Sequence, residues 1–305
     1  MIQVEQIAAY TGHRGSIFAL VTDPEELFAY SSGDDGTIAR WDLHGTPDLG
    51  DAVLQANGSI YSLELIPDLG WLAAGASDGT VYLVDLKEKK IVHSYRKTQG
   101  SIFWLWYEDW SQLLWVLHAK GGLSAISIST LKEEFFLQVA EDHLRSIASF
   151  GESLFLGSSD QHIYEFDRQQ MMVRRGWKAH DSSVFSLGIH QAGKYLLSGG
   201  RDAHLKMWDL QQEGFPQVQS IPAHNFTVNS LAFSPQGDYL ITASRDKTLK
   251  LWDAYQLNLL KVIDLARHEG HRHSVNRVLW LTRDNSIISC SDDRRILRWR
   301  IKVET

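Results

Sequence analysis

Histidine, hydroxyl and acidic side chains recur together at fixed spacing in this sequence. In each set a Ser or Thr precedes an Asp by four residues, and a His that follows Gly or Ala comes earlier. Ser, His and Asp are the groups of a hydrolytic triad, in which the hydroxyl attacks and the imidazole takes its proton. The four sets are His13, Ser31 and Asp35; His180, Ser198 and Asp202; His224, Thr242 and Asp246; and His271, Ser289 and Asp293.

A Trp stands six residues after each of these Asp residues and changes what the sets can do. The indole N–H can only donate, whereas a hydroxyl can accept from it and donate onward to the imidazole, whose other nitrogen donates to the Asp. Such a chain is buried, while a nucleophile needs a solvent-reached hydroxyl beside an oxyanion site. We therefore predict structural tetrads and no enzyme, the tetrads being completed by Trp41, Trp208, Trp252 and Trp299.

Three histidines, His268, His271 and His273, have a spacing that resembles a metal cluster. No Cys accompanies them, although structural zinc favours closed four-ligand sites. His271 already belongs to a tetrad, which leaves two solvated loop histidines beside arginines. We expect no metal and no cofactor.

The tetrads need strands to position them, and the stretch from Ala223 to Asp253 supplies three. They are predicted over 227–233, 239–243 and 248–253, with turn-forming residues between them. An isolated meander of this size cannot bury both of its faces, so it must stack against similar units. Copies of its third strand end at Trp41, Val84, Ile126, Phe166, Trp208, Trp252 and Trp299.

These strand ends are 40 to 47 residues apart, and a period near ~40–45 residues is that of a four-stranded propeller blade. Seven copies fill the chain, which predicts a single domain over residues 1–305. With its Gly-His, Ala-His and Trp-Asp pairs in register, the chain resembles the WD40-repeat β-propeller family over essentially all of its length. The resemblance implies an all-β, seven-bladed propeller of four-stranded antiparallel blades.

Residues 2–9 alternate apolar and polar side chains, as an edge strand does. They lie where each other repeat places its fourth strand, and the last repeat lacks that strand. We therefore expect the amino-terminal strand to complete the last blade, which closes the propeller and removes open sheet edges.

The third and fourth repeats depart from the pattern. The fourth keeps His143 and Asp160 but has Phe166 at the Trp position, so we expect His143 to matter less for stability than His224. The third has lost its set, and its aromatic residues are either core filling or an exposed interface on the flank. These residues are Trp104, Trp106, Trp115 and Trp110, the last of which stands in a turn and is the best candidate for exposure.

Composition limits the kinds of partner and the cellular compartment that the sequence allows. With 30 Lys and Arg against 37 Asp and Glu, the net charge is −7, which disfavours a broad nucleic-acid footprint. The single cysteine, Cys290, excludes an intramolecular disulfide and favours a reducing compartment. We find no signal peptide and no apolar run of the ~18–20 residues that a membrane helix needs. We expect a cytoplasmic protein with no membrane partner, monomeric in isolation.

The resemblance also implies where a partner binds. In this family the His-bearing loops and Asp-bearing turns share one end of the propeller, the top. The residue after each strand-opening Val or Ile should lie near the channel mouth, surrounded by the residues that precede each turn Asp. The first group is Phe18, Tyr61, Phe103, Ala148, Phe185, Asn229 and Asn276, and the second is Asp34, Ser77, Ala119, Ser159, Arg201, Arg245 and Asp292.

Function is predicted from this surface and from the resemblance. We expect a non-catalytic scaffold that binds a protein or peptide at the top face and channel mouth. Phe18, Tyr61, Phe103 and Phe185 would anchor an apolar group, and Arg201 and Arg245 would hold an acidic or phosphorylated one. One alternative is that the aromatic residues plug the channel and the arginines pair with neighbouring Asp residues. Another is a propeller enzyme, or a binder of small ligands or modified peptides, that uses the central channel.

Overall fold

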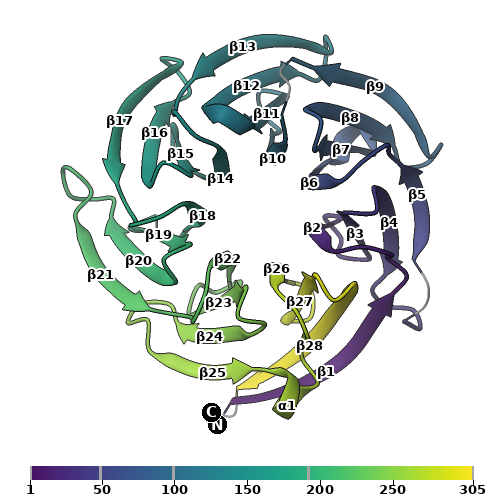
Figure 1. The fold of residues 1–305 in the computed structure, drawn as a ribbon, viewed down its shortest axis with the longest axis vertical. Coiled ribbons are helices and arrows are strands. Elements are labelled where there is room, and N and C mark those ends of the chain that lie inside the picture. Colours follow the sequence, from purple (N-terminus) through teal and green to yellow (C-terminus); the bar gives the residue numbers. More distant parts are fainter. Residues whose placement is uncertain (1, 48–49, 98–99, 191–192, 304–305) are drawn as a thin grey trace. The chain divides into compact units, whose positions relative to one another are not determined.

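The computed structural model describes residues 2–47, 50–97, 100–190 and 193–303. The chain folds into seven antiparallel sheets of four strands each (Figure 1), which confirms the predicted fold class of a seven-bladed β-propeller. It separates into two compact units, one formed by residues 10–146 and the other by residues 1–9 and 147–305. Each unit is described by itself below.

The unit over residues 10–146 contains three complete blades and the start of a fourth. Blade one comprises β2 Ile17–Thr22, β3 Phe28–Gly33, β4 Thr37–Asp42 and β5 Asp51–Gln55. Blade two comprises β6 Ile60–Ile66, the 3₁₀ turn η1 Pro67–Leu69, β7 Trp71–Ala76, β8 Thr80–Asp85 and β9 Lys90–Arg96. Blade three comprises β10 Ile102–Glu108, β11 Leu113–His118, η2 Ala119–Gly121, β12 Gly122–Ser127 and β13 Lys132–Gln138.

Blade four opens with β14 Leu144–Phe150 and continues in the other unit with β15 Ser153–Ser158, β16 His162–Asp167 and β17 Met172–Lys178. Blade five comprises β18 Val184–Ile189, β19 Tyr195–Gly200, β20 His204–Asp209 and β21 Gln217–Pro222. Blade six comprises β22 Val228–Phe233, β23 Tyr239–Ser244, β24 Leu249–Asp253 and β25 Leu259–Ile263. The short helix α1, Leu265–His268, leads to blade seven, formed by β26 Val275–Trp280, β27 Ser286–Ser291, β28 Arg295–Val303 and β1 Ile2–Thr11.

The faces of neighbouring blades bury one another, as the size of a single meander requires. Between blades six and seven, Leu249 and Leu251 of β24 belong to the same buried cluster as Val275 and Val278 of β26. Successive side chains in a strand point to opposite faces. Residues two apart therefore enter one core, as Leu249 and Leu251 do in β24. Val275 and Val278 are three apart because the ladder of β26 shifts between Val275 and Arg277.

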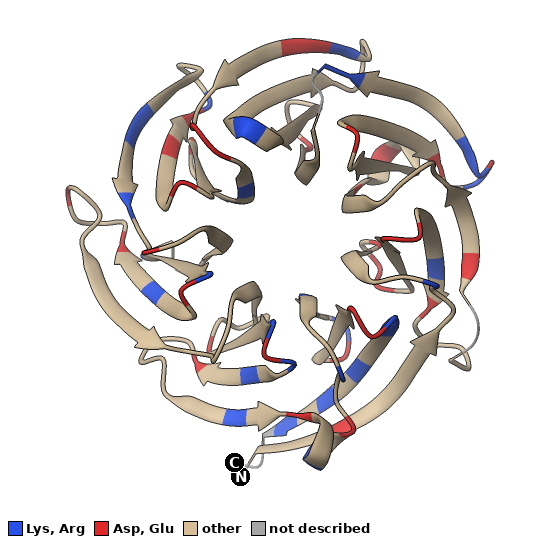
Figure 2. Ribbon diagram, in the orientation of Figure 1, with Lys and Arg blue, Asp and Glu red and all other residues tan. Residues whose placement is uncertain are grey.

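The amino-terminal strand β1 is the outermost strand of the sheet that the last three strands form, and lies beside β28 (Figure 1). Ile2 and Val4 pack against the core of that blade. On the other side of the strand, Glu5 forms ion pairs with Arg300 and Lys302. Figure 2 shows several Lys and Arg residues along the strand labelled β28 in Figure 1. The predicted pairing of residues 2–9 with the last blade is confirmed.

Candidate partner-binding site

In blade six, four side chains form a continuous hydrogen-bonded chain between three parts of the sheet. Trp252 Nε1 donates to Thr242 Oγ1 over 2.8 Å, and this hydroxyl lies 2.8 Å from His224 Nε2. His224 Nδ1 then lies 2.9 Å from a carboxylate oxygen of Asp246. Because an indole only donates, the hydroxyl accepts from it and its own hydrogen is directed to Nε2, which leaves Nδ1–H to donate to Asp246.

Blades one and five have the same chain with nearly the same distances. In blade one, Ser31 Oγ lies 2.7 Å from both Trp41 Nε1 and His13 Nε2. His13 Nδ1 lies 2.9 Å from Asp35. The corresponding side chains in blade five are Trp208, Ser198, His180 and Asp202.

Blade seven differs from the sequence-based expectation. His271 bridges Ser289 and Asp293 at 2.8 and 3.0 Å, as in the other three blades. The buried Nε1 of Trp299, however, donates no hydrogen bond to any described residue. The predicted four-membered chain is therefore three-membered in this blade.

Burial and hydrogen bonding together set the protonation of the blade-six groups. Burial alone would raise the pKa of the Asp246 carboxyl, but hydrogen bonds from His224, Thr248 and the Asn225 backbone outweigh it and hold the pKa well below its ordinary value. For His224 burial dominates and lowers the pKa, so the ring is neutral at pH 7. In blade seven burial likewise lowers the pKa of His271, and for Asp293 hydrogen bonds outweigh burial and lower the pKa. The chains of blades six and seven thus each pair an ionised carboxylate with a neutral imidazole.

The buried hydroxyls cannot serve as nucleophiles. Ser31, Ser198, Thr242 and Ser289 are completely buried, so no substrate carbonyl reaches them. The single thiol, Cys290, is also completely buried. Burial raises its pKa to about 12, which keeps it protonated and unreactive.

Trp252→Phe is expected to lower the free energy of unfolding by about 1–3 kcal/mol, because Thr242 loses its donor inside the core. Trp299→Phe is the matched control, since Trp299 is equally buried but has no such bond to lose. We expect the shift of its urea midpoint to be clearly smaller. An equal or larger loss for Trp299→Phe would contradict the role given to the indole bond.

The predicted channel-mouth residues share a backbone feature that the sequence does not show. In each blade whose first strand pair is defined, the ladder skips the second residue of the first strand as a β-bulge. A bulged residue leaves the regular alternation, and this re-aims its side chain. The bulged residues are Phe18, Tyr61, Phe103, Phe185, Asn229 and Asn276.

In the unit over residues 10–146, these side chains form a row of ring contacts from blade to blade, which we call the aromatic row. The ring centres of Phe18 and Tyr61 lie 5.2 Å apart, and those of Tyr61 and Phe103 lie 5.7 Å apart. The row continues to the ring of His143, 5.2 Å from Phe103. All four residues are partly exposed, so the row offers solvent a line of aromatic surface.

The end of the row corrects the sequence-based alignment of blade four. Strand β14 begins at Leu144, so the residue after the strand opening is Arg145, not Ala148. The tetrad His position four residues before Leu144 is held by Ala140, whose N–H bonds to Gly121 as that of His180 bonds to Gln161. His143 is therefore not a tetrad residue. Asp160, which we paired with it, instead accepts from the Tyr164 hydroxyl.

His143 and Arg145 give the aromatic row a polar end that the sequence analysis missed. The guanidinium of Arg145 lies 4.4 Å from the centre of the Phe103 ring, a cation–π distance. His143 Nδ1 accepts a hydrogen bond from the Lys120 N–H. The sequence could have indicated these two residues if Leu144 had been taken as the first residue of the strand. Ile147 is also apolar and was an equally suitable first residue.

In blades six and seven the bulged positions carry amides that bond within the protein. Asn229 donates to the carbonyl of Val275 over 2.9 Å, and Asn276 donates to Asp292 over 2.8 Å. Of the other predicted surrounding residues, Asp34 accepts from the Ser59 hydroxyl, and Ser77, Ala119 and Ser159 are partly buried.

Phe185, Arg201 and Arg245 lie in the unit that contains blades five to seven. Phe185 is the partly buried bulged residue of β18. Arg201 and Arg245 are exposed, and neither guanidinium forms an ion pair within the described ranges. This disagrees with the alternative in which the arginines pair with Asp residues beside them.

The blade-three tryptophans are not equivalent. Trp115 is a core residue of β11 with 1% of its surface exposed, and Trp104 and Trp106 are partly buried. Trp110, in the turn between β10 and β11, is 77% exposed. The core interpretation thus applies to Trp115 and the interface interpretation only to Trp110.

Among the described residues, no three His, Cys, Asp or Glu side chains gather closely enough to hold a metal ion. Among the same residues, no helix has the length and apolar character needed to cross a bilayer.

Four-stranded antiparallel sheets carrying His–hydroxyl–Asp chains define this protein as a β-propeller with structural tetrads. The family model of the WD domain, G-beta repeat (WD40), matches more than half of the chain. The chain therefore belongs to the WD40-repeat family. The matched residues are 4–42, 52–85, 172–209, 215–253 and 263–300, which leaves out the divergent third blade and the first three strands of the fourth.

Individual relatives are distant. The chain is 24% identical over 207 residues to a striatin homolog of Dictyostelium discoideum, which covers 66% of this chain and 21% of that protein. It is 26% identical over 200 residues to transducin-like enhancer protein 2 of Mus musculus, covering 62% and 24%. It is 35% identical over 83 residues to the small ribosomal subunit protein RACK1 of Neurospora crassa, covering 27% and 25%. The matched part is at most a quarter of each relative.

Proposed function

We propose that this chain is a non-catalytic WD40 scaffold that binds a protein or peptide through the face bearing its tetrad loops. The aromatic row is the observation that carries the proposal. Three bulged aromatic residues in successive blades, Phe18, Tyr61 and Phe103, contact one another and keep part of their rings exposed. Aromatic side chains held rigidly at a surface are the usual anchors of protein interfaces.

The chemistry of the partner follows from the polar end of the row. Arg145 lies over Phe103 and His143 lies beside it, so an apolar group on the row would have a cation next to it. A peptide with an apolar anchor and an adjacent acidic or phosphorylated group fits the row and Arg145. In the other unit, Arg201 and Arg245 are two exposed cations that suit an acidic or phosphorylated group. One relative is named as a small ribosomal subunit protein, and such a name is consistent with a role as part of an assembly rather than as an enzyme. Cytoplasmic location and a monomeric state remain predictions.

The proposal is tested once affinity purification from the native source has supplied a partner. The double variant Tyr61→Ala with Phe103→Ala is expected to weaken binding at least about tenfold, because hot-spot aromatics contribute about 2 kcal/mol or more each. Arg201→Ala with Arg245→Ala is expected to weaken binding several-fold while leaving the melting temperature nearly unchanged, since neither side chain forms an ion pair in the described structure. Affinity is measured by isothermal titration.

Trp110→Ala is the matched control, because Trp110 is an exposed aromatic in a turn rather than at a bulge. It is expected to leave affinity unchanged. If the row variant binds as tightly as the parent chain while Trp110→Ala does not, the tetrad-loop face is not the site and the flank of blade three is.

A further inference from the structure

In three blades a cation satisfies the backbone carbonyl that precedes the tetrad His. Lys206 Nζ donates to the carbonyl of Ala179 over 2.7 Å in blade five, and Lys250 Nζ donates to that of Ala223 over 2.6 Å in blade six. In blade seven, Arg295 Nη2 donates to the carbonyl of Gly270 over 3.0 Å. The same backbone group is thus capped by a positive side chain each time.

Blade one has the tetrad but lacks this cation. Lys206 and Lys250 stand directly opposite the tetrad hydroxyl in the strand ladder, and Ala39 stands opposite Ser31 in blade one. The position of Arg295, two residues after the tetrad Asp, is held there by Thr37, whose hydroxyl bonds to Gln55 instead. No described side chain donates to the carbonyl of Gly12, which is the equivalent of Ala179 and Ala223.

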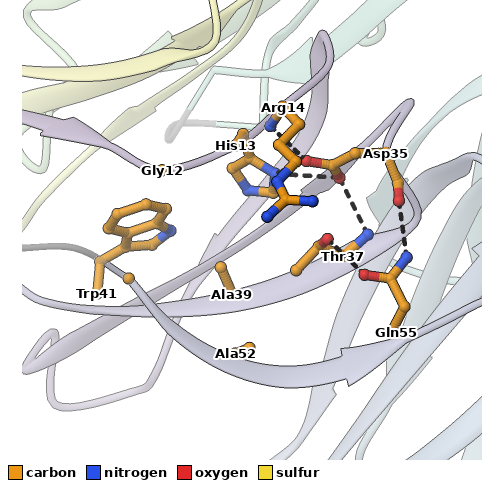
Figure 3. A pocket seen from close by; sticks show the side chains of 10 residues that line it. Gly12, His13, Arg14, Asp35, Thr37, Ala39, Trp41, Ala52 and Gln55 are labelled. Carbon is orange, nitrogen blue, oxygen red and sulfur yellow. Dashed lines mark hydrogen bonds and ion pairs between the residues drawn. The ribbon is translucent and has the colours of Figure 1, made fainter.

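A pocket of about 560 Å³ lies where the cation would be (Figure 3). Ala39 and Ala52 form one wall, the indole of Trp41 another, and Gly12, His13 and Asp35 border it. The backbone of Gly50 packs directly against the Trp41 ring, where a Cβ would come within 2.7 Å of it. Pockets that hold small ligands span about 300–1,000 Å³, so the volume suits a ligand group rather than one water.

The wall chemistry selects a cation. In blade six, Lys250 Nζ lies 5.9 Å from the centre of the Trp252 ring while it donates to its carbonyl, and an indole face attracts a cation at such a distance. The blade-one pocket offers the same carbonyl, the same indole and the equivalent tetrad carboxylate, that of Asp35. Arg14, exposed at the mouth beside Asp35 in Figure 3, weakens the attraction for any cation and most of all for one with two positive charges.

We propose that this pocket binds a primary alkylammonium group, which takes the place that Lys206 and Lys250 occupy in their own blades. The group donates to the Gly12 carbonyl, and its alkyl chain lies along Ala39 and Trp41. A lysine side chain of a partner and a free monoamine both carry this chemistry. The proposal does not depend on the aromatic row.

The test uses the intact chain and two pairs of probes. n-Butylammonium is compared with n-butanol, and Nα-acetyl-lysine N-methylamide with its norleucine counterpart, by isothermal titration at low salt. We expect each ammonium to bind at least about tenfold more tightly than its neutral partner. Tighter binding of the lysine derivative than of n-butylammonium would identify a partner's side chain as the source, and the reverse order a free amine. Equal binding of n-butanol and n-butylammonium would overturn the proposal.

Ala39→Lys assigns the binding to this pocket. The new ammonium is expected to cap the Gly12 carbonyl from within, abolish binding of both ammonium probes and raise the melting temperature. Ala39→Met is the control of similar length without charge, and it should block the probes without the same rise in melting temperature. Arg14→Gln, which leaves the pocket walls intact, should tighten ammonium binding. Unchanged probe affinity in Ala39→Lys, or a lower melting temperature than that of Ala39→Met, would contradict the proposal.

Discussion

Deletion of residues 2–9 is expected to abolish cooperative unfolding of the blade that contains β26, β27 and β28, or to cause aggregation. The deletion removes strand β1, exposes the hydrogen-bonding edge of β28, and takes Ile2 and Val4 out of the core between blades six and seven. An unpaired apolar edge is a template for pairing with another chain. Thermal unfolding followed by circular dichroism, together with size-exclusion chromatography, measures the effect.

Glu5→Gln is the matched control for this deletion. It removes the ion pairs with Arg300 and Lys302 but keeps the strand. Because these pairs are exposed, we expect a change of at most about 1 kcal/mol. A synthetic peptide of residues 1–11, added to the truncated chain, should restore cooperative unfolding by occupying the free edge. A truncated protein that melts like the full chain would show that β1 is dispensable.

His224→Ala is expected to lower the free energy of unfolding by about 2–4 kcal/mol, because two buried partners, Thr242 and Asp246, each lose a hydrogen bond. His143→Ala is expected to cost less than about 1 kcal/mol. His143 is partly exposed, and its ring contacts the Lys120 N–H, the Asp142 carboxylate and the Phe103 ring. Urea denaturation of both variants compares the two positions.

Equal shifts of the urea midpoint for the two His variants would contradict this ranking. His143→Ala has a second expected effect, which separates stability from binding. Because His143 ends the aromatic row, the variant should weaken partner binding although its unfolding is nearly unchanged. His224→Ala should not alter binding at temperatures where it remains folded.

The fold class followed from the sequence because blade structure repeats in it. In the four blades that have a Trp near the end of the third strand, this Trp lies at the same ladder position, as Trp252 does opposite Leu240. The residue set therefore recurs with the blade. The strand over residues 2–9 was recognisable for a different reason. Apolar and polar side chains alternate along this strand, so Ile2 and Val4 lie on one apolar face. Only the last blade lacked a fourth strand, so this face was expected to pack there.

The candidate site was less accessible from the sequence, because it depends on backbone register. Leu144 and Ile147 are both apolar, and only the backbone bond from Ala140 to Gly121 shows which of them opens β14. The sequence-based alignment was three residues out of register in this blade. It therefore assigned Ala148 instead of Arg145 to the channel mouth and assigned His143 to a tetrad. The blade-one pocket exists because Ala39 and Thr37 stand where other blades have a basic side chain. The sequence does not show that Lys206 and Lys250 bond to a backbone carbonyl, so it does not reveal that blade one lacks this bond.

The pairing of β1 with β28 has a consequence for how the protein is made. A ribosome adds about 5–20 residues per second, and nearly the whole chain separates these two strands. Strand β1 is synthesised before β28 and must then wait roughly 15–60 s for its partner. During that interval it is an unprotected edge that another nascent chain could pair with. Gln3 and Glu5, exposed on alternate positions of β1, oppose such pairing because polar and charged side chains discourage edge-to-edge association. The alternation that identifies this strand thus also protects it while the last blade is still incomplete.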